Sequence, residues 1–387
     1  MSVLFNRHPH VDAANRTFWR APVVFLGLWY GWVLLSPVMG GGEFSFSSPY
    51  LMAPLFVILG FGAARQLKKL WSNRTVIPLL IAVTTVVVAS QTIYANARGA
   101  TGVLLVGLAA LIINDERIST RAGASSRPVS ARGSKNFSGN QDRFFSTGAS
   151  ANPRGRGKVG ENGAERTHPN RVVLLALLVG ITGILMSSSA QASFILALLL
   201  LLACVLAITW SAPPKWLSFL VGFLGVELAV IVVTYLGSRE SWPDWLSDGQ
   251  SLSSARHELW NDALELWSTN PVMGAGMGTF TASSELASTT PHLRATHSLF
   301  LQTGAELGAI GVLLLTCLFA YALYVSSTGA RSAAFIGMMT WVSLGIHTSI
   351  DHLEDFPIVW LMAGAVLAWC RPLVPRNKSL KSSPAFN

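Results

Sequence analysis

Long apolar stretches alternate with shorter polar ones along this chain of 387 residues. A helix needs roughly 17–25 residues to cross the hydrocarbon of a bilayer, and ten of the apolar stretches approach or reach that length. They cover residues 21–39, 49–64, 75–95, 100–114, 172–187, 193–210, 216–236, 298–325, 333–350 and 357–370. The pattern predicts an all-α fold, a polytopic bundle of about ten transmembrane helices.

Composition agrees with this prediction. Hydrophobic residues make up 51% of the chain and charged residues only 12%, whereas a soluble domain is about one quarter charged. No small-residue cleavage site follows the first apolar run, so we interpret that run as a retained span and not as a signal peptide. The three cysteines lie in or at the ends of apolar runs and indicate neither a disulfide framework nor a metal site.

The basic residues predict the orientation of the bundle. Of the 28 Lys and Arg residues, 24 fall in six polar pieces that alternate onto one side: 1–20, 65–74, 115–171, 211–215, 326–332 and 371–387. Cytoplasmic loops carry such an excess, so we expect a multi-pass protein of the cytoplasmic (inner) membrane with both termini in the cytoplasm. The formal charge of +9 is then a topology signal, and we expect no nucleic-acid partner.

The opposite side keeps four basic residues, all arginines, and one long polar segment. The arginines are Arg98, Arg239, Arg256 and Arg294. The segment covers residues 237–296, between the seventh and eighth spans, and holds three of those arginines together with seven acidic residues and four tryptophans. A long loop held between two spans is a common place for function.

Polar composition also divides the chain. Residues 117–170 are rich in Arg, Ser, Gly and Asn and poor in aliphatic residues, so we predict a disordered, basic cytoplasmic linker. The linker separates a four-span N-terminal half, residues 1–116, from a six-span half, residues 171–371, with a tail at 372–387. No internal repeat is evident.

A helix is predicted inside the long outer loop, from Ser253 or Ser254 to about Thr269, before Asn270-Pro271. One face is apolar, and its tryptophans suit a membrane interface, so the helix either lies on the bilayer or covers a site. The first turn holds Arg256, where the helix dipole disfavours a cation and favours an anion. This placement favours a phosphate partner for Arg256 over a surface ion pair with Glu258 or Asp262.

Glycines follow this helix and recur in the next span. Gly274, Gly276 and Gly278 resemble a phosphate-binding loop only superficially, because no strand precedes them, and we interpret them as turn residues. At helical spacing, Gly304 and Gly308 lie on the same face as His297, which begins the eighth span. That face either packs closely against another helix or forms a slot for a lipid tail.

Ionisable residues within the spans are further candidates, since such groups are costly in hydrocarbon. Glu227 and Glu306 are both of this kind, and we expect Glu306 to face away from His297 and to bond a neighbouring helix. Residues His347, Asp351, His352, Glu354 and Asp355 lie near the outer end of the ninth span. Their spacing favours a solvated turn over a metal site.

The motifs around these residues resemble the O-antigen ligase and O-antigen polymerase superfamily. They are His297-Ser298 with Gly308-x-x-Gly311 downstream, Arg256-x-x-x-Trp260, and Asn270-Pro271-x-x-Gly274-x-Gly276. The resemblance covers roughly residues 171–370 and is specific in the loop and the eighth span.

The resemblance implies a glycosyltransferase of cell-surface polysaccharide biosynthesis that works without metal or other cofactor. Such enzymes transfer a glycan from undecaprenyl diphosphate to an acceptor hydroxyl on a glycan, lipid or protein, at the outer face of the membrane. It also implies that His297 activates the acceptor and that Arg256 holds the diphosphate.

One departure from the family pattern concerns a second arginine. The family usually carries a Ser-Arg pair where this chain has Ala190-Gln191, so Arg98, Arg239 or Arg294 would have to replace that arginine. The alternative functions are a transporter or flippase of lipid-linked sugars or small anions, and a non-enzymatic assembly partner.

Overall fold

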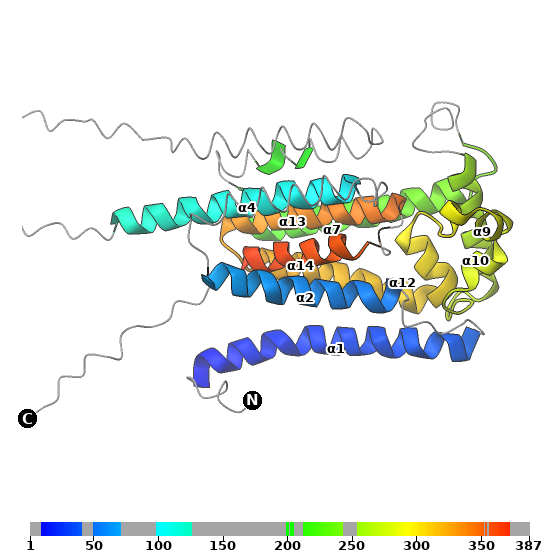
Figure 1. The fold of residues 1–387 in the computed structure, drawn as a ribbon, viewed down its shortest axis with the longest axis horizontal. Helices are drawn as coiled ribbons and strands as arrows, with labels where there is room; N and C mark the ends of the chain where they lie inside the picture. The colour runs from blue at the N-terminus through cyan, green and yellow to red at the C-terminus, as the bar shows by residue number, and fades with distance from the viewer. Residues whose placement is uncertain are drawn as a thin grey trace, which may run out of the picture.

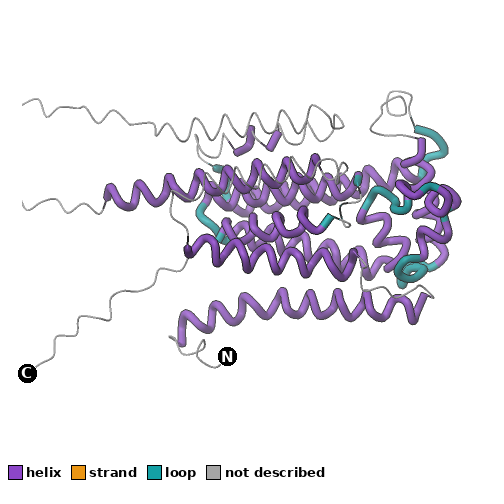
Figure 2. Tube along the Cα trace, in the orientation of Figure 1, coloured by secondary structure: helices purple, strands orange, loops and turns teal. Residues whose placement is uncertain are grey.

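Helices make up all the regular secondary structure that the structure describes. The computed structural model describes residues 9–40, 49–70, 98–125, 199–200, 202–204, 212–242, 254–351, 353 and 356–371. No strand occurs among these residues (Figure 2). The predicted all-α fold class is confirmed.

Seven long helices coincide with predicted spans. They are α1 (Pro9–Gly40), α2 (Pro49–Leu70), α4 (Arg98–Ser125), α7 (Lys215–Gly237), α12 (Leu299–Ser327), α13 (Arg331–Ile350) and α14 (Pro357–Cys370). Helices α2, α7, α12 and α13 are long and apolar enough to cross a membrane, and α1, α4 and α14 contain shorter apolar stretches. The protein is therefore a multi-pass membrane protein.

The total of ten spans stays a prediction. The predicted spans at residues 75–95 and 172–187 lie outside the described residues, and the one at 193–210 is described only at 199–200 and 202–204.

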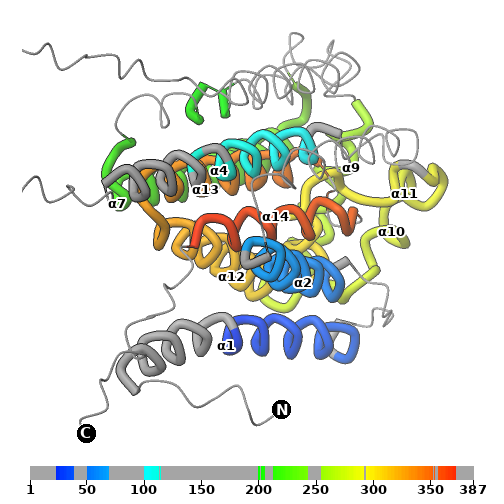
Figure 3. The backbone as a smooth tube through the Cα atoms, turned by 60° about the vertical axis from the view of Figure 1, so that its left-hand side comes forward, coloured from blue at the N-terminus to red at the C-terminus, as the bar shows by residue number. Residues whose placement is uncertain are grey.

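Helix α13 lies in the middle of the described bundle and contacts α4, α7, α12 and α14. Helix α2 packs along α14, and α1 lies to one side of the bundle against α12 (Figures 1 and 3). The shorter helices α9 (Ser254–Thr269), α10 (Thr279–Ser283) and α11 (Glu285–Thr289) gather at one end. We call this the loop end, and the opposite one the far end.

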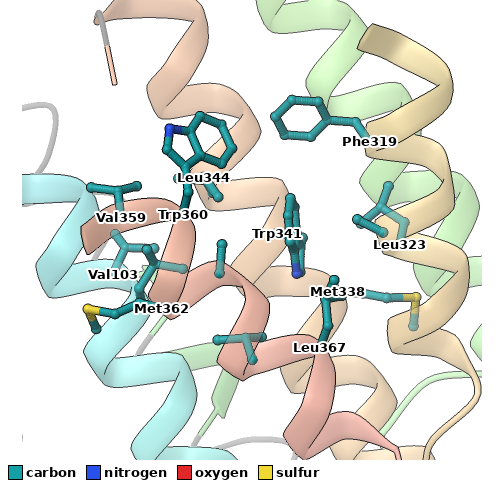
Figure 4. Packing of buried hydrophobic residues seen from close by; sticks show 14 of the residues in the cluster. Val103, Phe319, Leu323, Met338, Trp341, Leu344, Val359, Trp360, Met362 and Leu367 are labelled. Atoms are coloured by element: carbon teal, nitrogen blue, oxygen red, sulfur yellow. The ribbon is translucent and has the colours of Figure 1, made fainter. Parts of the chain in front are cut away.

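Aromatic and aliphatic side chains fill the space between the helices. Trp341 of α13 stands edge-on to Phe319 of α12, with 5.8 Å between ring centroids, amid the apolar cluster drawn in Figure 4. Glycines allow α2 and α14 to approach closely: a methyl group at Gly60 would overlap the backbone of Leu361. Small residues at such contacts are typical of helix packing in membranes.

Helix α4 extends beyond its apolar part. It continues to Ser125, so the first residues of the predicted linker, 117–125, are helical and the expectation of disorder was wrong for them. Several good helix formers continue the pattern after the apolar stretch, so the helix need not stop where hydropathy falls. The rest of the linker, residues 126–170, lies outside the described residues.

Helix α12 is broken at Gly308, although the sequence predicted a continuous span. Gly308 has φ 67° and ψ −169°, a combination that only glycine adopts readily. The break exposes backbone groups that the loop then bonds. Ala275 and Gly276 donate their N–H groups to the carbonyls of Ala305 and Glu306, both at 2.9 Å.

The other side of the break is bonded by the same turn. The N–H groups of Ala309 and Ile310 donate to the carbonyls of Pro271 and Val272, at 2.9 and 3.4 Å. Irregular backbone at membrane depth is tolerated only when its polar groups are satisfied in this way. The turn of residues 271–278, which we call the docking turn, is therefore part of the bundle and not a surface connection.

The loop helix α9 ends at Thr269, as predicted, and packs on α12 and α7. Trp260 is fully buried, with 5.2 Å between its ring and that of Trp242, so the expectation that Trp260 faces the membrane interface was wrong. A second apolar cluster, distinct from the main core, holds Trp260 together with residues of α7, α10 and α12. Burying this face fixes α9 as a lid over the loop end of the bundle.

Candidate functional site

His297 stands immediately before α12, at the loop end, and 7% of its surface is exposed. Its φ of 55° lies in the left-handed region and is the only positive value at a non-glycine residue in the described part of the chain. Such a conformation costs on the order of 1–3 kcal/mol and persists only where the surroundings enforce it. The strained backbone therefore indicates that the surrounding structure holds His297 in this conformation.

Hydrogen bonds on both sides of His297 provide that enforcement. The Thr296 hydroxyl donates to the Ser298 carbonyl at 2.7 Å and accepts from the Ser298 N–H at 3.1 Å. The Thr296 N–H donates to the Gln302 side chain at 3.0 Å. Ser298 also caps α12, because its hydroxyl accepts from the Leu301 N–H.

Asp351, directly after α13, contacts the imidazole of His297. The distance from His297 Nδ1 to Asp351 Oδ1 is 3.1 Å, and both side chains are largely buried. An ionised carboxylate only accepts hydrogen bonds, so Nδ1 carries the proton and the imidazole lone pair lies on Nε2. Asp351 thus fixes both the tautomer and the orientation of His297.

Arg256 belongs to the same region. The buried imidazole of His347, one turn before Asp351 on α13, lies within electrostatic reach of both Asp351 and Arg256. Residues from α9, α13 and the start of α12 therefore converge at the loop end. We call His297, Asp351, His347 and Arg256 the loop-end cluster.

The solvated turn predicted around His347 and Asp351 was wrong for these two residues. His347 is 2% exposed, and Asp351 bonds His297 across 54 residues of sequence. A local pattern could not show this, because the partner comes from a different helix. His352, Glu354 and Asp355 lie outside the described residues.

Glu306, in α12, bonds the loop through its carboxylate. Its buried carboxylate accepts from the Phe280 N–H at 3.3 Å and from the Gln302 side-chain amide at 3.5 Å. The bond to Phe280 joins Glu306 to the loop, and the expected bond to a neighbouring span stays a prediction. Glu227, the other acid predicted within a span, is half-buried on α7.

Loop residues cover the glycine face of α12. A methyl group at Gly304 would overlap the Trp267 ring, and one at Gly308 would overlap Val272 and Gly274. Gly304 and Gly308 therefore serve close packing and do not form a slot for a lipid tail, because the docking turn and α9 occupy the space that such a tail would need. The glycines Gly274, Gly276 and Gly278 have φ of 78°, 105° and 80°, which fits the predicted turn.

The three arginines that could replace the missing family arginine lie at different places in the structure. The Arg239 guanidinium lies over the Tyr235 ring at 5.0 Å, and its carbonyl oxygen lies 2.7 Å from His257 Nε2, in the first turn of α9 beside Arg256. Arg294 is exposed, three residues before His297. Arg98 begins α4, and its side chain lies outside the described part. The structure thus brings Arg239 to the turn that carries Arg256.

Comparison with known families adds an independent observation. A family model described as O-antigen ligase matches residues 174–316, which include α7, α9, the docking turn and the first part of α12. Residues 174–316 are thus similar to the O-antigen ligase family. No curated protein and no solved structure matches the chain.

The O-antigen ligase match covers two of the four residues of the loop-end cluster. Arg256 and His297 lie inside it, whereas His347 and Asp351 lie beyond its end at residue 316. The chain is thus an O-antigen ligase-like membrane protein, and this similarity indicates a role in polysaccharide biosynthesis. Sequence reasoning missed the bond between Asp351 and His297; the group of ionisable residues near the end of the ninth span was the signal for it, and it was interpreted as a solvated turn.

Proposed function

We propose that this protein is a glycosyltransferase that transfers a glycan from a polyprenyl diphosphate, such as undecaprenyl diphosphate, to an acceptor hydroxyl at the outer face of the cytoplasmic membrane. The observation that carries the proposal is the loop-end cluster: a strained histidine bonded to a carboxylate, with Arg256 within electrostatic reach of the neighbouring His347. It lies within and beside the segment that matches the O-antigen ligase family.

His297 acts as the general base in this proposal. With the proton on Nδ1 directed at Asp351, Nε2 takes the proton of the acceptor hydroxyl as the oxygen attacks the anomeric carbon of the donor. The imidazolium that forms is stabilised by the carboxylate 3.1 Å away. General base catalysis of this kind contributes typically about 10²–10⁴-fold to a rate.

Arg256 stabilises the leaving group. As the new bond to the anomeric carbon forms, the bond from that carbon to the diphosphate oxygen breaks, and the electron pair leaves with the polyprenyl diphosphate. A guanidinium binds phosphate oxygens through two parallel N–H groups and stays charged. Its position in the first turn of α9 adds the partial positive charge of the helix N-terminus.

Arg239 is the best candidate for the second diphosphate-binding arginine. Its backbone bonds the first turn of α9, which places it on the same corner as Arg256. Arg294, three residues before His297, is the other arginine that could bind the diphosphate. The proposal assigns no metal or other cofactor, since a histidine and arginines supply the base and the charge that the transfer requires.

A deletion strain tests the assignment. We expect it to accumulate lipid-linked glycan, and we expect wild-type protein, but not His297→Ala or Arg256→Ala protein, to restore transfer. Variants must be inserted at the wild-type level, with Arg331→Ala as a control at the far end. A transporter would instead leave the glycan donor on the inner side of the membrane, and full activity of both cluster variants would exclude the proposed mechanism.

A further inference from the structure

An apolar cavity of about 430 Å³ lies among α1, α2 and α12. Its wall runs from Tyr50 and Leu299, near the loop end, to Tyr321 and Val325, toward the far end, and contains no charged side chain. The volume falls in the range of small-molecule sites, about 300–1,000 Å³. An apolar cavity of this size inside a membrane protein suits a hydrocarbon chain.

Hydrogen bonds from α1 hold the cavity open on its loop-end side. Trp29 Nε1 donates to the Tyr50 carbonyl at 2.8 Å, and Trp32 Nε1 donates to the Leu307 carbonyl at 2.9 Å. The Tyr30 hydroxyl donates to the Leu51 carbonyl at 3.1 Å. These bonds fix the distance between α1 and its neighbours, so the cavity is a built feature and not a gap left by a loosely attached helix.

Cationic side chains stand at the far end of the same helices. The Lys68 ammonium donates to the carbonyls of Trp369 and Arg371, at 3.1 and 3.4 Å, and thereby caps the C-terminus of α14. Burial lowers the pKa of the Arg371 guanidinium, and the nearby charge of Arg65 lowers it further. Lys68 therefore has a structural role at this end, and Arg371 lies within electrostatic reach of Arg65.

Arg65 connects these charges to the cavity. Its guanidinium carbon lies 6.0 Å from the centroid of Phe61, a wall residue. Its Nη1 is buried and bonds no group in the described residues. Arg371 acts electrostatically on Tyr321, which is also in the wall. A buried donor without an acceptor is costly, and an anion between the two guanidinium groups would relieve both that cost and their repulsion.

We propose that the cavity and the Arg65–Arg371 pair together bind one anionic phospholipid. Its phosphate accepts hydrogen bonds from the guanidinium groups, and one of its acyl chains lies along the cavity. Basic pockets between membrane helices bind anionic lipid head groups in this way. The site is separate from the loop-end cluster, because the arginines stand at the opposite end of α2 and α14 from His297 (Figure 1).

A phospholipid fits better than the polyprenyl donor of the proposed reaction. The donor must present its diphosphate at the loop end, where Arg256 and His297 lie, whereas the cations beside the cavity are at the far end. In the predicted topology the far end faces the cytoplasm, and anionic lipids of the cytoplasmic leaflet attract basic residues there.

Native mass spectrometry of the full-length protein, released from nanodiscs of equal parts phosphatidylglycerol and phosphatidylcholine, tests the proposal. We expect one phosphatidylglycerol to be retained in preference to phosphatidylcholine. The double variant Arg65→Gln/Arg371→Gln should reduce that preference about tenfold or more, the effect of losing charge-assisted hydrogen bonds. Arg331→Gln, which removes an exposed charge at the same end, should leave it unchanged.

A second pair of variants tests the cavity itself. Gly62 lines the cavity, and the first carbon of a side chain there would meet nothing within 4 Å, so Gly62→Leu adds apolar volume at the cavity wall without a clash at that carbon. Gly31→Leu is the matched control, since Gly31 is exposed and equally open but outside the cavity. We expect Gly62→Leu, and not Gly31→Leu, to abolish lipid retention.

Three results would overturn the proposal: equal retention of both phospholipids, unchanged preference in the double variant, or displacement of phosphatidylglycerol by equimolar undecaprenyl phosphate. The last result would assign the cavity to the donor. None of these measurements depends on glycan transfer, so the proposal stands or fails separately from the proposed function.

Discussion

The substitution Gly308→Ala tests how the outer loop is attached to the bundle. Gly308 has φ 67° and ψ −169°, and a methyl group there would overlap the Val272 carbonyl and the Gly274 nitrogen. Alanine can therefore be accommodated only if α12 straightens or the docking turn moves away. Either movement separates residues 271–278 from the break in α12.

The magnitude follows from the backbone and its hydrogen bonds. Holding a non-glycine residue in this conformation costs about 1–3 kcal/mol. Four backbone hydrogen bonds join the docking turn to the break, and losing them adds about 2–6 kcal/mol at roughly 0.5–1.5 kcal/mol each. Losses of this size are a large share of the stability of a typical domain, so we expect release of the docking turn, loss of the His297 geometry and loss of transfer.

Hydrogen exchange on the purified protein measures the release directly. We expect the amides of Ala275, Gly276, Ala309 and Ile310 to lose protection in Gly308→Ala protein, together with a lower melting temperature. Gly31→Ala is the control, because Gly31 is in a regular helix with open space around it. Wild-type protection of these four amides in Gly308→Ala protein would refute the described docking.

Three further predictions concern the cluster, its support and the linker. Asp351→Asn should lower transfer about 10²–10⁴-fold with unchanged insertion, because the amide no longer enforces the proton on Nδ1 of His297; near wild-type rates would remove Asp351 from the mechanism. Glu306→Ala should destabilise the protein by about 1–3 kcal/mol for each buried N–H left without an acceptor. Glu306→Gln should destabilise it by less, because glutamine keeps one carbonyl oxygen for the Phe280 N–H. Equal melting temperatures of the two variants would contradict this. Deleting residues 126–165 should preserve activity, since they are predicted to be disordered and cytoplasmic; a well-inserted deletion without activity would show otherwise.

Much of the fold could be predicted from hydropathy. The apolar runs locate the seven long helices that the structure describes, and the end of α9 at Thr269 follows from Asn270-Pro271. These are local features, because span length and helix stop signals depend only on neighbouring residues.

The break at Gly308 could not be predicted in the same way. The residues around it are apolar on both sides, so hydropathy indicates one continuous helix, and the groups that satisfy the broken backbone come from residues 271–276 of the loop. The sequence indicated turn residues in the docking turn and, separately, a glycine face at Gly304 and Gly308. The close contact of Gly308 with Gly274 explains why both are glycine, and the contact of Gly304 with the Trp267 ring explains the third glycine.

The candidate site was likewise predicted in part. Arg256 and His297 stood out by position, but whether they act as proposed remains a prediction. Asp351 and His347 reach the cluster because α13 returns to the loop end beside the start of α12. A pairing across 54 residues leaves no local pattern in a single sequence.

The most direct test of the central claim is transfer by purified protein in proteoliposomes, measured as release of polyprenyl diphosphate from a lipid-linked glycan in the presence of acceptor. The account predicts release by wild-type protein and a loss of about 10²–10⁴-fold in His297→Ala protein, with Arg331→Ala protein unaffected. Release by His297→Ala protein at the wild-type rate would contradict it.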